Sequence, residues 1–217
     1  MKFIKILIEN GFTIIEVSQT TPPPNPTREV TNIYSPGTYI DEISSPENNY
    51  LASLYIEEID TNIFMCGASI ADVSTGKLLV FQSLSDNGDE IIALDELVKL
   101  MQSYNTKEII VTTYNVTSYD KYKLLSYLEI AHKLVTIKTL QEVMTIKGNK
   151  MIDKIAYHAE QFKTIYNKTI ADFNLELYTH GRIALAILYN YISAHNQNLL
   201  KNIGEPNLLE KQTNLHL

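Results

Sequence analysis

The chain of 217 residues has no tryptophan and one cysteine, Cys66. A single cysteine excludes an internal disulfide, and no Cys/His spacing typical of a structural zinc site is present. Cys66 lies within an apolar run, which favours a small buried hydrophobe. No run reaches transmembrane length, and the apolar stretch after Met1 is too short for a signal peptide. We therefore expect an intracellular protein, not secreted and with no membrane partner.

Basic charge is also scarce. The chain carries 18 Lys and Arg against 25 Asp and Glu, a net charge of −7. This balance argues against a stand-alone nucleic-acid binder, since such proteins present a basic face to phosphate. A mildly basic region is present, and a solvated helix face is the favoured interpretation over a binding patch. Its members are Lys121, Lys123, Lys133, Lys138 and Lys147.

Catalytic and cofactor motifs are missing as well. None of the eight glycines belongs to a Gly-x-x-x-x-Gly-Lys-[Ser/Thr] nucleotide loop. Neither a Gly-x-Ser-x-Gly nor a His-Glu-x-x-His motif occurs, and no two of the five histidines are four residues apart. We expect no cofactor and no catalytic, cofactor-binding or metal-binding residue in this chain.

A hairpin over residues 64–82 is the strongest local signal. Two apolar runs flank Ser74, Thr75 and Gly76, a small-residue turn. The first run is apolar on both faces apart from Ser69 and Asp72, which is typical of a central strand in a covered sheet.

The elements around this hairpin predict an α/β fold. Three consecutive antiparallel strands, a helix, a strand, a helix and a last strand give the order βββ-α-β-α-β, which is the layout of the ribonuclease-H-like fold. This assignment is an analogy from element order. The predicted ranges are strands at 50–56, 64–73, 77–82, 108–114 and 134–138, with helices near 91–101 and 118–131.

Asp72 is the one chemically suggestive residue of the hairpin. A ribonuclease-H-type enzyme uses carboxylates on and near its first strand to hold two Mg²⁺ ions. One carboxylate does not hold such a pair, so we favour a turn cap that binds backbone N–H groups. Partners for the metal alternative would have to come from Asp95, Glu96, Glu108 or Asp120.

Both flanks of this region have patterns of their own. Residues 2–9 predict a short helix, and residues 12–18 and 28–34 predict strands on either side of a proline spacer at 22–26. Beyond residue 148 the pattern is helical, and residues 183–192 are apolar almost all round, which predicts a helix buried among other helices. The tail contains leucines that we expect to be unpartnered: Leu208, Leu209, Leu215 and Leu217.

Two motifs resemble a known family. Residues 28–42, with Ser-Pro-Gly-Thr at 35–38, are similar to a segment of MutS mismatch-repair proteins. Asn48-Asn-Tyr-Leu-Ala52 followed by Asp-Val-Ser-Thr-Gly at 72–76 resembles the family's next landmark. Residues 11–19 are similar to the family strand that comes before residues 28–42, although Ser18 replaces the glutamate in the Glu-Gln pair that usually ends that strand. The proline spacer is similar to that of divergent MutS forms from large DNA viruses and some coral mitochondria.

The resemblance implies a domain map. Residues 1–43 would be the end of the mismatch-recognition domain, 44–148 the ribonuclease-H-like connector without nuclease activity, and 149–217 the start of the helical core and lever domain, truncated. The family's Phe-x-Glu mismatch reader would precede Met1 and its ATPase would follow Leu217. ATP and Mg²⁺ are therefore implied only for absent parts, and a cytoplasmic, viral-factory or mitochondrial location is open.

Three functions remain open from the sequence. The first is a structural connector of a MutS-like protein, which as a whole would be a mismatched-DNA-binding ATPase. Its partners would be the remaining MutS domains or a second MutS subunit, possibly MutL, and DNA indirectly. The second is a Mg²⁺-dependent nuclease that uses Asp72. The third is a free-standing interaction module. Unpartnered leucines in the tail would favour the first, and a compact end would favour the third.

Overall fold

The computed structural model describes residues 2–40, 49–85, 88–145 and 152–209. Its elements, in chain order, are α1 (Lys2–Glu9), β1 (Ile14–Gln19), β2 (Arg28–Tyr34), β3 (Tyr50–Asp60), β4 (Ile63–Asp72), β5 (Leu78–Leu84), α2 (Ile92–Ser103), β6 (Thr106–Tyr114), α3 (Lys121–Tyr127), β7 (Val135–Thr139), α4 (Leu140–Thr145), α5 (Ile155–Tyr166), the 3₁₀-helix η2 (Ala171–Phe173), α6 (Thr179–His195), α7 (Gln197–Leu200) and β8 (Pro206–Leu208). None of the described helices is long and apolar enough to cross a membrane.

A mixed sheet with the strand order β7-β6-β3-β4-β5-β8 forms the centre of the molecule. Strands β3, β4 and β5 pair antiparallel, while β6 pairs parallel with the other side of β3 and β7 pairs parallel with β6. Three antiparallel strands, with two further strands added beside the first, make the ribonuclease-H-like topology. The predicted order βββ-α-β-α-β and the α/β fold class are thus confirmed.

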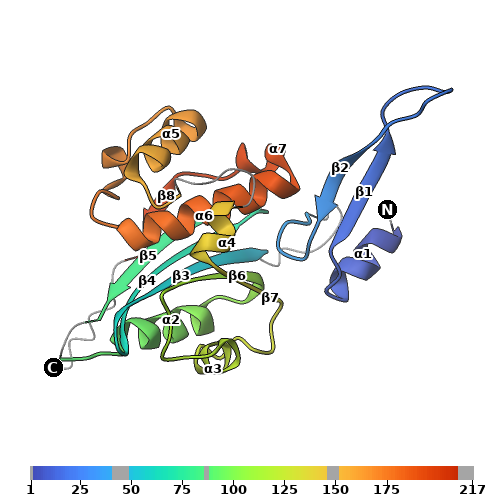
Figure 1. Cartoon of the computed structure of the whole chain (residues 1–217). Coiled ribbons are helices and arrows are strands. Elements are labelled where there is room, and N and C mark those ends of the chain that lie inside the picture. Colours follow the sequence, from blue (N-terminus) through green and yellow to red (C-terminus); the bar gives the residue numbers. More distant parts are fainter. Residues whose placement is uncertain (1, 41–48, 86–87, 146–151, 210–217) are drawn as a thin grey trace.

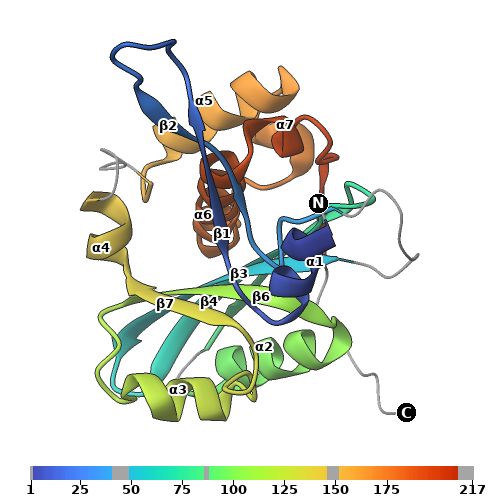
Figure 2. The same ribbon diagram turned by 90° about the vertical axis from the view of Figure 1, so that its right-hand side faces the viewer.

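Helices cover both faces of the sheet (Figure 1). Helices α2 and α3 lie on one face, and α6 crosses the other, with α5 beyond it (Figures 1 and 2). Alternate residues of β3 serve the two faces, because successive side chains of a strand point in opposite directions. Leu51 and Tyr55 belong to the core under α6, and Leu54 and Ile56 belong to the core over α2 and α3. We call these the α6-side core and the α2-side core.

Cys66 confirms the prediction of a small buried hydrophobe. Its thiol is fully buried on β4, within the α2-side core. Burial raises the pKa of this thiol, which keeps it protonated and unreactive.

Two glycines allow α6 to lie directly on the sheet. A Cβ atom at Gly67 of β4 would stand 2.0 Å from the backbone oxygen of His180, at the first turn of α6. A Cβ atom at Gly181 would stand 2.9 Å from Val80 Cγ1 on β5. Both strand and helix therefore lack a side chain where they meet, and the two backbones come into contact.

The domain boundary expected between residues 148 and 149 stays a prediction, but a helix beyond it packs directly on the sheet. Helix α6 contacts β3, β4 and β5, and its residues Ile183, Leu185 and Leu188 share the α6-side core with Leu51 and Tyr55. The apolar pattern of the helix correctly predicted burial. The prediction from the same pattern that the helix lies among other helices is corrected, because its main partner is a face of the sheet.

The tail prediction is also corrected. Pro206–Leu208 forms β8, which pairs parallel with β5 and extends the sheet. Leu208 packs against the α6-side core and Leu209 against the α2-side core, so neither is unpartnered. The backbone N–H of Leu209 also donates to Val80 at 2.8 Å. Leu215 and Leu217 lie outside the described residues.

The first two strands form a separate antiparallel hairpin that projects from the body together with α1 (Figures 1 and 2). We call α1, β1 and β2 the N-terminal unit. It carries seven of the fourteen large hydrophobic side chains that are exposed in the described structure. They are Phe3, Ile6, Leu7, Phe12, Ile15, Val17 and Val30. The unit therefore buries little of its apolar surface within the described structure.

Candidate functional site

Asp72 caps the turn between β4 and β5. Its carboxylate accepts hydrogen bonds from the backbone N–H and hydroxyl of Ser74, at 3.0 and 2.5 Å, and from the hydroxyl of Thr75 at 2.9 Å. The N–H of Asn49 also donates to it, at 3.3 Å. Burial raises the pKa of Asp72, but these hydrogen bonds outweigh that effect and lower it overall. The arrangement is that of a turn cap.

The carboxylates weighed as metal partners of Asp72 serve other purposes. Asp95 of α2 accepts from the hydroxyl of Tyr127, and Asp120 caps α3 by accepting from the N–H of Lys123 at 2.9 Å. Glu96 lies on α2. Across the four described ranges, no group of three His, Cys, Asp or Glu side chains is placed to hold a metal ion. The described geometry thus gives Asp72 no metal-binding neighbourhood.

Glu108 joins the N-terminal segment to the body. Its Oε2 accepts from the N–H of Gly37 at 3.0 Å, and its Oε1 accepts from the hydroxyl of Tyr191 on α6. The carboxylate of Glu108, on β6, is buried, with the residue 2% exposed. We call Gly37, Glu108 and Tyr191 the Glu108 junction. It ties together three segments that are far apart in the sequence.

The Ser-Pro-Gly-Thr motif has the shape that this junction requires. Ser35 and Thr38 are buried, and the Thr38 hydroxyl accepts from the N–H of Ser35 at 3.1 Å. A Cβ atom at Gly37 would stand 2.8 Å from Leu51 Cδ1 and 2.9 Å from Glu108 Oε2. Only glycine brings the backbone N–H this close to the carboxylate without displacing its neighbours. Both motifs that resemble the MutS family are therefore structural positions, one a junction and the other a turn cap.

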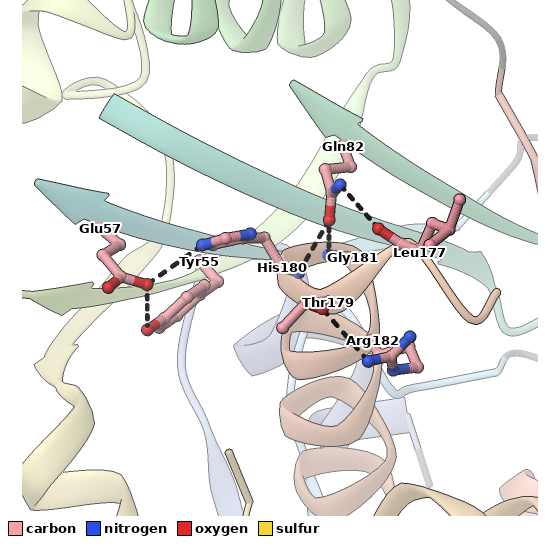
Figure 3. Close-up of polar contacts among 8 residues, drawn as sticks. All are labelled: Tyr55, Glu57, Gln82, Leu177, Thr179, His180, Gly181 and Arg182. Carbon is pink, nitrogen blue, oxygen red and sulfur yellow. Dashed lines mark hydrogen bonds and ion pairs between the residues drawn. The ribbon is translucent and has the colours of Figure 1, made fainter. Parts of the chain in front are cut away.

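A third polar cluster lies at the amino end of α6 (Figure 3). The side chain of Gln82 on β5 accepts from the N–H groups of His180 and Gly181, at 2.8 and 3.4 Å, and donates to the carbonyl of Leu177 at 3.2 Å. It thereby caps a helix whose own N-cap residue, Tyr178, supplies no side-chain hydrogen bond. A strand residue thus fixes where the helix begins on the sheet.

His180 and Glu57 pair across the same contact. His180 Nε2 lies 3.1 Å from Glu57 Oε2, which also accepts from the hydroxyl of Tyr55 at 3.2 Å (Figure 3). The His180 ring stacks on the Tyr55 ring, with centroids 5.7 Å apart. Burial lowers the pKa of His180, and the nearby Glu57 offsets only part of this change. A neutral imidazole that donates to the carboxylate is therefore the form expected at pH 7.

Arg182 closes the loop that leads into α6. Its guanidinium donates to the carbonyls of Leu175 and Glu176 and to the hydroxyl of Thr179, the last at 3.2 Å. The residue is 4% exposed, so its charge is committed to this loop and is not offered to a ligand. The cluster in Figure 3 accordingly docks α6 on the sheet and has the chemistry of a structural site.

Glu58 forms a further buried structural site at the end of β3. Its carboxylate accepts from the backbone N–H groups of Asn62, Thr117 and Ser118. Burial raises the pKa of Glu58, but the bonds from Ser118, Thr117 and Asn62 prevail and lower it to about 2. This side chain fastens the β3–β4 turn to the loop after β6.

Local sequence patterns do not predict the Glu108 junction, the Gln82 cap or the contact between Gly67 and α6. From the sequence, Glu108 is a candidate metal ligand only, although its position at the start of an otherwise apolar strand is a signal of a buried carboxylate with a structural partner. The spacing of Gly67 and Gly181 carries no local signal, since neither lies in a turn.

The lysines of the basic region noted in the sequence do not form one patch. Lys121 and Lys138 line the same cavity, whereas Lys123 pairs with Asp120 and Lys133 donates to Thr106. Lys147 is outside the described residues.

Comparison with known proteins supports the sequence resemblance. The chain is 30% identical over 95% of its length to a putative DNA mismatch repair protein mutS homolog of Acanthamoeba polyphaga mimivirus. It is 36% identical over 50% of its length to the DNA mismatch repair protein MutS of Macrococcus caseolyticus. It spans 20% and 12% of these two relatives, respectively. No protein-family model matches the chain.

Among solved structures, RuvC of T. thermophilus in complex with a Holliday junction substrate aligns with a TM-score of 0.41 and 10% identity. The alignment covers 68% of this chain and 96% of that one. The relation to mismatch-repair proteins accordingly rests on sequence. The chain is a partial-length relative of the MutS DNA mismatch repair proteins.

Proposed function

We propose that this chain is the structural connector of a MutS-like DNA mismatch repair protein and performs no catalysis of its own. The observation that carries the proposal is the Glu108 junction, which fixes a projecting N-terminal unit to a sheet and to its long covering helix. A connector must transmit a displacement from one part to another. A buried, hydrogen-bonded joint does so because it cannot bend without breaking bonds.

The exposed apolar surface of the N-terminal unit supports the same proposal. Monomeric proteins rarely expose a large contiguous apolar patch. Half of the exposed large hydrophobic side chains belong to this one unit, as described above. We propose that other MutS domains or a second MutS subunit cover it, with DNA reached only through those parts and MutL as a possible further partner. The mismatch-reading and ATPase activities would reside in the rest of such a protein.

A chimera tests this function. Residues 1–217 would replace the aligned segment of the mimivirus relative, and ATP hydrolysis would be measured with matched and mismatched duplex DNA. We expect the chimera to respond to the mismatch as the parent does. The variant Gly37→Val, which wedges a side chain into the Glu108 junction, should keep the basal rate and lose the response to the mismatch.

The matched control is Glu29→Val, which places the same side chain at an exposed position of β2. This control should respond as the unmodified chimera does. A Gly37→Val chimera with an undiminished mismatch response would contradict the proposed role of the junction. A chimera with parental basal hydrolysis and no mismatch response would contradict the connector function itself.

One observation favours the alternative of a free-standing interaction module. Residues 206–209 pack into the sheet and both cores, so the part of the tail that is described is covered. The chimera distinguishes the two functions, because a module that had lost the repair role would not restore a response to mismatched DNA.

A further inference from the structure

A cavity of about 310 Å³ lies at the carboxyl ends of the parallel strands β6 and β7. Ligands of open α/β sheets bind in crevices outside the carboxyl ends of their strands, and this volume is within the range of ligand pockets. The cavity is remote from the Glu108 junction, where β6 begins. Its lining comes from β6, the loop after it, α3, β7 and the start of α4. We call it the β6–β7 cavity.

The floor of the cavity is apolar. Leu124 of α3 is 1% exposed, and Val116, Tyr119 and Ile137 are partly buried side chains that pack against the α2-side core. A hydrated ion alone would leave this floor uncovered. The floor therefore fits a ligand that carries an apolar side chain.

The rim is basic. Lys121 and Lys138 line the cavity, and neither forms a salt bridge with a carboxylate of the described residues. The one carboxylate in the lining, Glu142, accepts from the N–H and hydroxyl of Thr139, at 2.6 and 3.0 Å. Hydrogen bonds from Thr139 lower the pKa of Glu142, and the positive charges of Lys138 and Lys121, which line the same cavity, act in the same direction. Two cations and one anion leave a net positive rim.

An open strand edge runs beside this rim. Strand β7 is the last of the sheet and pairs only with β6 among the described strands. The outer N–H and C=O groups of such an edge can pair with an extended segment, which gives affinity through the main chain while adjacent pockets select side chains. Edge and cavity share Ile137, Lys138 and Thr139.

We propose that the β6–β7 cavity and the edge of β7 bind an extended, acidic segment of a partner protein. An apolar side chain of the segment enters the cavity, and its neighbouring carboxylates meet Lys121 and Lys138. The site is independent of the Glu108 junction and goes beyond the proposed connector function. A nucleic acid fits less well, because it has no peptide N–H and C=O groups to pair with the edge of β7.

The test uses the full chain labelled with ¹⁵N and a synthetic peptide of alternating aspartate and leucine. We expect amide shifts in β7 and α3, and an affinity that falls as salt rises. The double variant Lys121→Glu/Lys138→Glu should weaken binding about tenfold or more, since like charges replace attraction by repulsion. The matched control is Lys99→Glu/Lys201→Glu, which makes the same charge change at exposed positions elsewhere and should bind within about twofold of the wild type.

Binding measurements with other peptides decide what occupies the site. A peptide of alternating lysine and leucine should not bind, and a peptide of alternating aspartate and serine should bind more weakly because it cannot fill the floor. The proposal is overturned if the acidic peptide causes no shifts in β7, if both double variants weaken it equally, or if a single-stranded oligonucleotide binds the same amides more tightly. A second, milder variant, Lys121→Gln/Lys138→Gln, gives the same direction of change if charge reversal prevents folding.

Discussion

Three buried carboxylates of this protein have structural roles that a sequence motif search would easily take for catalysis. Asp72, Glu58 and Glu108 each accept at least one backbone N–H from another segment or from a turn. An ionised carboxylate is a strong acceptor with room for several donors, so one such side chain can fix a loop whose N–H groups have no partner in a strand or helix. At the scale of the residue, buried carboxylates hold irregular backbone in place by accepting its hydrogen bonds.

Asp72→Ala tests this interpretation at its most suggestive position. The variant leaves the N–H of Ser74 without its acceptor and should lower the free energy of unfolding by about 0.5–2 kcal/mol, the usual cost of losing a capping side chain. Urea denaturation measures the change, and Glu29→Ala at an exposed position is the control. Plasmid cleavage with Mg²⁺ should be indistinguishable between variant and wild type. Cleavage by the wild type that disappears in Asp72→Ala would restore the nuclease hypothesis.

At the scale of the element, the docking of α6 on β4 decides how the two halves of the chain form one body. The helix begins where Gln82 caps it, and Gly67 and Gly181 let it lie against the strands without intervening side chains. The neighbouring buried residues on the same face of β4 are also small, namely Ser69 and Ala71. This close approach explains why a helix that is apolar almost all round lies on a sheet.

Gly67→Ala should therefore be costly. Its Cβ would stand 2.0 Å from the carbonyl oxygen of His180, so the helix must move away, and overpacking of this kind costs about 1–3 kcal/mol. The graded control is Gly204→Ala, whose Cβ would meet its nearest neighbour at 3.0 Å and should cost less. Urea denaturation of both variants measures which one loses more of its free energy of unfolding. Equal stability of Gly67→Ala and the wild type would show that α6 is not held at this distance.

The elements that sequence reasoning predicted correctly are those with a local signal. The hairpin, the cap at Asp72 and the order βββ-α-β-α-β follow from alternation, turn residues and helical spacing within short windows. The packing partner of α6 cannot be predicted in this way. An apolar helix pattern predicts that the helix is buried, but it does not predict which surface buries it. The apolar run of β4 had nevertheless predicted a covered sheet, and joining these two expectations would have placed the helix. Strand β8 has three residues and begins at a proline, too short for a periodic pattern.

The Glu108 junction could not be predicted from local sequence patterns for a different reason. Gly37 and Glu108 are 71 residues apart, and Tyr191 is 83 residues from Glu108. Nothing within either segment specifies the other. The resemblance to MutS proteins marked the Ser-Pro-Gly-Thr motif as distinctive, and the structure supplies the physical reason: its glycine is the position where the N-terminal segment contacts β6.

At the scale of the whole molecule, the protein consists of a covered sheet and a projecting N-terminal unit joined at a buried site (Figures 1 and 2). Helix α6 contacts β2 as well as the sheet, so the same helix supports both parts. The proposed connector function depends on this joint being rigid. If the unit pivoted freely, a displacement of its apolar surface would not reach the sheet.

The distance between the two parts tests rigidity most directly. Spin labels at Glu29→Cys on β2 and Lys99→Cys on α2, in a Cys66→Ala background, would be measured by pulsed electron paramagnetic resonance. We predict one narrow distance distribution for the otherwise unchanged chain and a broad one when Gly37→Val is added, because the new side chain cannot fit beside Leu51 and Glu108. A distribution that is already broad without Gly37→Val, or one that stays narrow with it, would contradict a rigid connector.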